Sequence, residues 1–156
     1  MKSFRFLLCL CGTLVSACYF SPLYNNNTTK GVCVTPISEQ SGYQIQRLLK
    51  QSFPDTSDCQ YTLKVTSPQI QLSDQSISDK DFITMQQVQA RTSYQLLNAK
   101  KEVVLTNTLS TTGSSAVISN PYATVTATEN TASNLETALA EQIALHVTAF
   151  LNRDTK

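Results

Sequence analysis

Residues 87–109 read QVQARTSYQLLNAKKEVVLTNTL, and this stretch decides the fold. Val88, Ala90, Thr92, Tyr94 and Leu96 alternate with Gln87, Gln89, Arg91, Ser93 and Gln95, and the alternation resumes at Val103, Leu105, Asn107 and Leu109. A repeat of two residues is typical of a strand that buries one face. Because the two runs flank the short polar turn 98–101, they predict a β-hairpin.

A helix is expected after the hairpin, at the C-terminal end of the sequence. Its apolar positions recur at helical spacing and form one stripe: Leu135, Leu139, Ile143, Val147, Phe150 and Leu151. Thr126, with Glu129 three residues later, fits a capping box at the start of this helix. Residues 113–120 are then expected to form a loop that Pro121 closes.

The residues before the hairpin predict three further elements. Residues 32–35 form a short apolar run that suits a strand, and residues 43–53 repeat apolar side chains at the spacing of an amphipathic helix. Residues 61–72 alternate as a strand, but their apolar positions change parity across 67–68, so a bulge or kink is required there. Residues 73–81 are polar and predict a surface loop.

The predicted order is strand, helix, three strands, helix, within one α/β domain over residues 32–156. Each strand has one apolar face and each helix has one apolar stripe, so stacking in two layers buries both. The fold class is therefore expected to be α+β. We expect a two-layer sandwich in which two helices pack on one face of a four-stranded, mostly antiparallel sheet.

The composition disfavours several classes of function. The formal net charge is +1 over 156 residues, and 59 of these residues are Ser, Thr, Asn or Gln, so no basic face for nucleic acid is expected. With 4 Gly and no glycine-rich phosphate motif, nucleotide binding is not expected. One His and no His/Cys cluster give little material for a metal site or an acid–base centre. We therefore expect no enzyme, no metal and no dissociable cofactor.

The N-terminus reads as a secretory signal. Lys2 and Arg5 precede an apolar run too short to span a membrane, and the run ends in Leu14-Val15-Ser16-Ala17-Cys18. This ending resembles the bacterial lipobox, which implies that residues 1–17 are cleaved and that Cys18 carries an N-acyl diacylglycerol. Residues 18–31 would then form the lipidated N-terminus and tether. The alternative is an ordinary secretory signal with an incidental cysteine.

Two cysteines, Cys33 and Cys59, are left in the mature chain after the signal and the lipid are accounted for. An even pair in an oxidising compartment predicts a disulfide that closes a loop of about 26 residues. Two buried free thiols are the alternative.

The remaining candidates for chemistry are few. His146 fits a packed or half-exposed helix residue better than a catalytic base, and Asp74, Asp79 and Asp81 fit solvated loop charge better than a cation site. The cations Lys64, Arg91, Lys100 and Lys101 could meet the phosphates of an anionic glycolipid. Simple solubility of an exposed sheet is the alternative explanation for each cation.

Three stretches together resemble one family. Residues 17–24, ACYFSPLY, are similar to the start of LptE, the LPS-assembly lipoprotein. Residues 94–96 and 103–105 resemble its central hairpin, and Pro121-Tyr122-Ala123 with the apolar stripe of residues 132–151 resembles its closing helix. The family implies the same two-layer fold that the periodicity predicts.

The resemblance also implies a role. LptE-like proteins are outer-membrane lipoproteins that sit as a plug inside the LptD β-barrel and help lipopolysaccharide to reach the outer leaflet. Tyr19, where Asp would signal inner-membrane retention, agrees with an outer-membrane location. The resemblance implies that the protein there faces the periplasm and the barrel lumen. The expected partners are the barrel, lipopolysaccharide and the membrane that holds the anchor, with no nucleic acid. A lipid-anchored auxiliary component of another envelope lipid transporter is the alternative.

Mass spectrometry of the mature N-terminus tests the anchor directly. We expect Cys18 to be the first residue and to carry a diacylglycerol thioether and an N-acyl chain, because two or more chains are needed for stable anchoring. An unmodified N-terminus, or a product that remains in the cytosol, would contradict this prediction.

Overall fold

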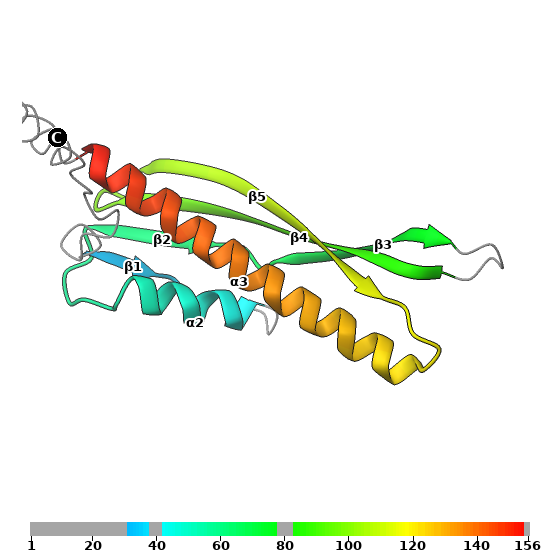
Figure 1. Ribbon diagram of the computed structural model, residues 1–156. Coiled ribbons are helices and arrows are strands. Elements are labelled where there is room, and N and C mark those ends of the chain that lie inside the picture. Colours follow the sequence, from blue (N-terminus) through cyan, green and yellow to red (C-terminus); the bar gives the residue numbers. More distant parts are fainter. Residues whose placement is uncertain (1–30, 38–41, 78–82, 155–156) are drawn as a thin grey trace, which may run out of the picture.

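The computed structural model describes residues 31–37, 42–77 and 83–154 (Figure 1). These residues form β1 (Val32–Val34), α2 (Tyr43–Ser52), β2 (Tyr61–Val65), β3 (Gln69–Ile77), β4 (Ile83–Asn98), β5 (Val103–Ala116) and α3 (Pro121–Asp154). The signal peptide, Cys18, most of the tether, Asp79 and Asp81 lie outside the described residues.

Every strand except β1 pairs with β4. Both β2 and β3 run antiparallel to β4 along one of its edges, against residues 94–98 and 83–91 respectively. The other edge of β4 pairs with β5, also antiparallel, and β1 pairs in parallel with β2. The sheet has five strands, but β2 and β3 lie end to end along the same edge of β4 and together take the place of one strand. The sheet is therefore four strands wide and mostly antiparallel, as expected, but the single strand expected over residues 61–72 is two strands, so five strands replace the expected four.

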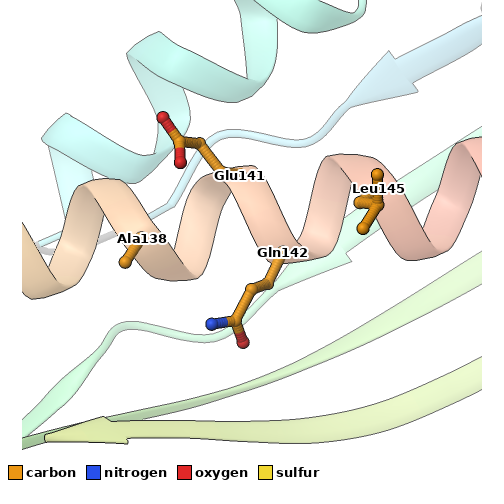
Figure 2. A pocket seen from close by; sticks show the side chains of 4 residues that line it. All are labelled: Ala138, Glu141, Gln142 and Leu145. Carbon is orange, nitrogen blue, oxygen red and sulfur yellow. The ribbon is translucent and has the colours of Figure 1, made fainter. Parts of the chain in front are cut away.

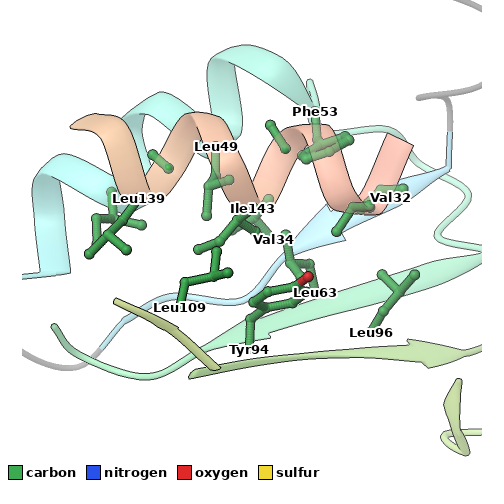
Figure 3. Packing of buried hydrophobic residues seen from close by; sticks show 14 of the residues in the cluster. Val32, Val34, Leu49, Phe53, Leu63, Tyr94, Leu96, Leu109, Leu139 and Ile143 are labelled. Carbon is green, nitrogen blue, oxygen red and sulfur yellow. The ribbon is translucent and has the colours of Figure 1, made fainter. Parts of the chain in front are cut away.

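Both helices cover the same face of this sheet (Figure 1). The long helix α3 packs on β4 and β5, and α2 packs against α3 and β1. The core between the layers includes Val32, Leu63, Tyr94, Leu109, Ile45, Leu49, Phe53, Leu139 and Ile143, many of which are labelled in Figure 3. The α+β class and the two-layer architecture are confirmed.

The parity change at 67–68 is confirmed as the break between β2 and β3. Val65 pairs with Tyr94 and Gln69 pairs with Arg91. Residues 66–68 between β2 and β3 therefore lie opposite only residues 92 and 93 of β4. Thr66 bridges the break, because its amide and its hydroxyl both donate to the Ser93 carbonyl, at 2.9 and 3.0 Å. The one extra residue returns the apolar positions to the helix side of the sheet.

Two predicted loops are strands instead. Residues 73–77 continue β3, and residues 113–116 continue β5. Ser73 and Asp74 are exposed, so no apolar repeat marks the end of β3 as a strand. Gly113 belongs in β5 because α3 approaches it closely: a Cβ there would lie 3.1 Å from Thr131 Cγ2.

The capping box predicted at Thr126 is wrong, because α3 begins at Pro121. Asn120 caps the helix, because its side-chain oxygen accepts a hydrogen bond from the Tyr122 amide at 3.0 Å. Pro121 suits the first position of the helix, since proline has no backbone N–H that would need an acceptor there. The first part of α3 is hard to predict from the sequence because it is rich in threonine, which is a poor helix former. Thr128 and Thr131 donate their hydroxyls to the carbonyls four residues earlier.

Within the described part of the chain, neither α2 nor α3 combines the length with the apolar composition that a membrane-spanning helix needs.

A disulfide joins Cys33 in β1 to Cys59, just before β2. The two Cα atoms lie 5.6 Å apart, and the cysteines are 26 residues apart in the sequence. The bond spans the parallel β1–β2 pair, so it ties the edge strand and α2 between them to the rest of the sheet.

Replacing both cysteines, as Cys33→Ala with Cys59→Ala, should lower the free energy of unfolding by about 3 kcal/mol, because the bond restricts the unfolded chain. Urea denaturation of the two proteins measures the loss. A reducing agent should destabilise the parent to the same degree and leave the double variant unchanged. Two reactive thiols in the unfolded, unreduced parent would contradict the prediction.

Candidate functional site: the uncovered face of the sheet

The face of the sheet turned away from the helices carries uncharged polar side chains. Val88, Ala90 and Tyr94 point toward the helices and are buried. Because successive side chains of a strand point to opposite faces, the polar side chains between them point away from the helices. On β4 and β5 they are Gln87, Gln89, Ser93, Gln95, Thr106, Thr108, Ser110 and Thr112, and we call this surface the polar face. None of the eight is charged, and Arg91, which lies between Gln89 and Ser93 on β4, is the one charged residue that lies among them.

Side-chain hydrogen bonds between strands order this polar face. Gln89 Nε2 donates to Ser110 Oγ at 3.1 Å, and the hydroxyls of Ser93 and Thr108 lie 2.8 Å apart. Such cross-strand pairs stabilise a sheet and hold its side chains in place. Four of the eight side chains of the polar face are therefore held in cross-strand pairs.

Lys64 and Arg91 both project from this same side of the sheet. Lys64 pairs with Gln95 across β2 and β4, and Arg91 pairs with Gln69 and Ser110 on its two neighbouring strands. Both side chains are exposed, and neither forms an ion pair with another described residue. Gln95 and Arg91 are four residues apart on β4, which separates the two cationic positions by about 13 Å along the strand.

Lys100 and Lys101 lie elsewhere, in the turn between β4 and β5. Asn98 shapes this turn, because its side-chain oxygen accepts from the amides of Lys100 and Glu102 at 2.9 and 3.0 Å. Lys101 has a positive φ of 64° and closes the turn. The structure therefore divides the four predicted cations into two groups: one pair on the polar face, and one pair at the end of the hairpin.

His146 lies on α3, where it is half-buried and contacts Tyr94 of β4. The Tyr94 hydroxyl is 3.1 Å from Nδ1 of His146, and either group donates according to the imidazole tautomer. Burial raises the pKa of Tyr94, while a hydrogen bond with the Asn107 side chain acts in the opposite direction. The phenol therefore stays neutral and fixes the imidazole ring, which agrees with a packed histidine.

A shallow pocket of about 240 Å³ opens beside this pair. Its lining includes Tyr94, Leu105, Asn107, His146, Ala149, Phe150 and Arg153. Among these described residues there is no Ser, Cys or carboxylate. Sequence reasoning missed Asn107 and Arg153 as neighbours of His146, because only the packing of α3 on β5 brings them together.

A second hollow, of about 280 Å³, runs along the outer side of α3 (Figure 2). Its described lining is Ala138, Glu141, Gln142 and Leu145. Figure 2 shows that the Glu141 and Gln142 side chains point in opposite directions from the helix. They do not converge on a common ligand position.

No group of three His, Cys, Asp or Glu side chains that could hold a metal occurs among the described residues. Asp74 is exposed on β3, and its predicted loop partners Asp79 and Asp81 lie outside those residues.

Solved structures of several bacterial lipoproteins superpose on this chain. Rare lipoprotein B from Shewanella oneidensis does so with a TM-score of 0.63 at 11% identity, over 79% of this chain and 98% of that one. Lipoprotein B from Nitrosomonas europaea gives a TM-score of 0.62 at 12% identity, over 83% and 91% of the two chains. A minor lipoprotein from Acinetobacter baumannii gives 0.59 at 18% identity, over 81% and 93%.

The chain has the fold of these lipoproteins. It is the LptE-like fold that the sequence resemblance implied, and that prediction is confirmed at the level of the fold. No family model matches the sequence, and no curated protein matches it.

Proposed function

We propose that this protein is an outer-membrane lipoprotein that fills the lumen of an LptD-type β-barrel and assists lipopolysaccharide assembly. The observation that carries the proposal is the polar face, which is free of carboxylates over β4 and β5 and holds two cross-strand hydrogen-bonded pairs. The LptE-like fold and the lipobox ending at Cys18 support it.

The chemistry of a barrel lumen matches the polar face. Strands of outer-membrane barrels alternate apolar and polar side chains, so the inner wall is polar. Ser, Thr and Gln side chains can exchange hydrogen bonds with water for hydrogen bonds with such a wall at little net cost. Buried charges without partners would be far more costly, so Arg91, the one charge that lies among these eight residues, would need an anionic partner in the complex.

The lipid anchor and the folded domain fit one location. About 13 residues separate Cys18 from Gly31, where the described chain begins, and an extended chain of that length reaches at most about 45 Å. The domain therefore stays close to the membrane surface that holds the acyl chains. The mature chain has 10 basic and 11 acidic residues, so lipid rather than net charge supplies the attachment.

Lys64 and Arg91 are proposed to contact the phosphates of lipopolysaccharide, and Lys100 with Lys101 forms the second cationic group. Lys50 shows the contrast, because its ammonium is 2.9 Å from Asp55 and is already paired. Unpaired Arg and Lys side chains can form charge-assisted hydrogen bonds to phosphate oxygens. The proposed role is binding and positioning, without bond-making.

Affinity purification of the lipidated protein from its own membranes tests the partner. We expect recovery of a large outer-membrane barrel, and we expect Gln87→Glu with Gln89→Glu to reduce that recovery by at least about tenfold, since unpaired carboxylates would be buried against the wall. Tyr122→Glu with Val125→Glu adds the same charge to exposed positions on α3 and should leave recovery unchanged. Recovery of an inner-membrane transporter, or of no barrel, would contradict the proposal.

Binding to vesicles that contain lipid A tests the cations separately. Replacing Lys64 and Arg91 together with Gln should weaken binding by about tenfold, because two charge-assisted contacts are lost. Lys50→Gln removes a cation that is already paired and serves as the matched control. Equal binding by the double variant and the parent would remove Lys64 and Arg91 from the lipid site.

A further inference from the structure

Among the described residues the sheet has three outer edges, on β1, β3 and β5, and they differ in how they discourage pairing with another strand. Edge strands are commonly protected by short length, charged side chains or bulges. β1 is 3 residues long. β3 carries the exposed Asp74, and its pairing with β4 shifts register twice between Asp74 and Ile77. Each of these two edges therefore has a recognisable protection.

The β5 edge has none of these protections along most of its length. β5 is 14 residues long and contains no charged residue and no proline. Its pairing with β4 shifts register once, near the turn, and then runs without interruption from Leu105 to Ala116. Twelve residues of regular strand extend over about 40 Å.

The hydrogen bonds show which β5 backbone groups point outward. The Ser93 amide and carbonyl bond to Thr66, on the β2–β3 side of β4, so they do not point to β5. Thr108, which pairs with Ser93, therefore has its own backbone groups on the outer edge, and its amide donates to the neighbouring Asn107 side chain at 2.8 Å. By the same alternation, the backbone groups of Thr106, Ser110 and Thr112 also point outward.

We propose that this edge pairs with β5 of a second copy of the chain. A strand can be extended only by a partner that has a free edge of its own. A closed β-barrel has no free edge, whereas a second copy offers the same unprotected strand. Antiparallel pairing about Leu109 places Thr108 opposite Ser110 of the other copy, and both have outward backbone groups.

The side chains of β5 are compatible with this self-pairing. Because the strand is uncharged, no like charges meet across the two-fold axis. Thr108 and Ser110 lie on the polar face, so the hydroxyls of the two copies would meet as Thr–Ser pairs, which favour antiparallel sheets. The two sheets would join into one, with their polar faces continuous.

Co-purification of two differently tagged, lipidated full-length copies tests this proposal, in cells that produce both copies in excess over any barrel partner. Parent copies should recover each other. Giving both copies Thr108→Lys with Ser110→Lys should reduce this recovery by about tenfold, because like charges then oppose each other. Pairing that variant with a copy that carries Thr108→Glu and Ser110→Glu should restore recovery, which also shows that both variants fold.

Gln71→Lys with Ser73→Lys is the matched control, since it places the same charges on β3 at the opposite edge and should not change recovery. Failure of parent copies to recover each other would overturn the proposal. So would recovery that ignores the β5 charges, or a lysine–glutamate pair that does not restore it. If the β5 lysines instead release a different protein, the edge belongs to that protein and self-pairing is wrong.

Discussion

The alternation of side chains along β4 is the constraint on which the rest of the structure depends. This strand pairs with β2, β3 and β5, so its direction and register orient nearly the whole sheet. Val88, Ala90, Tyr94 and Leu96 point to the helices and are almost completely buried. The intervening residues must then point the other way, because a strand repeats every two residues. One strand therefore specifies both the core and the polar face, and a slip of one residue would exchange them.

The break between β2 and β3 shows how the chain protects this alternation. A continuous strand over residues 61–72 would turn Ile70 and Leu72 to the polar face, since they differ in parity from Leu63. The extra residue at the break prevents this, and Thr66 replaces the interrupted backbone ladder with bonds to Ser93 and Thr92. The result is a long β4 that is supported along one edge by two short strands, with Ile70 and Leu72 kept off the polar face.

The two surfaces with proposed roles are separate parts of the same sheet. The polar face offers hydrogen-bonding side chains, while the outer edge of β5 offers backbone groups. Enclosure of the domain by a barrel would cover the first surface and would prevent a second copy from reaching the other. Self-pairing and barrel insertion would therefore be competing states of this protein, and the balance between them would depend on whether the barrel is present.

The sequence by itself determined the elements that bury a repeating apolar face: the hairpin centred on 98–101, the C-terminal stripe, the helix expected over 43–53 and the parity change at 67–68. Such signals exist because burial selects apolar side chains at a fixed period. Only the tertiary structure decided where β3, β5 and α3 begin or end. There, pairing with β4 or packing against Gly113 stabilises segments whose exposed Ser, Thr and Asp side chains carry no period. The same holds for the His146 pocket and the grouping of the cations, because residues far apart in sequence meet only after α3 docks and β2 pairs with β4.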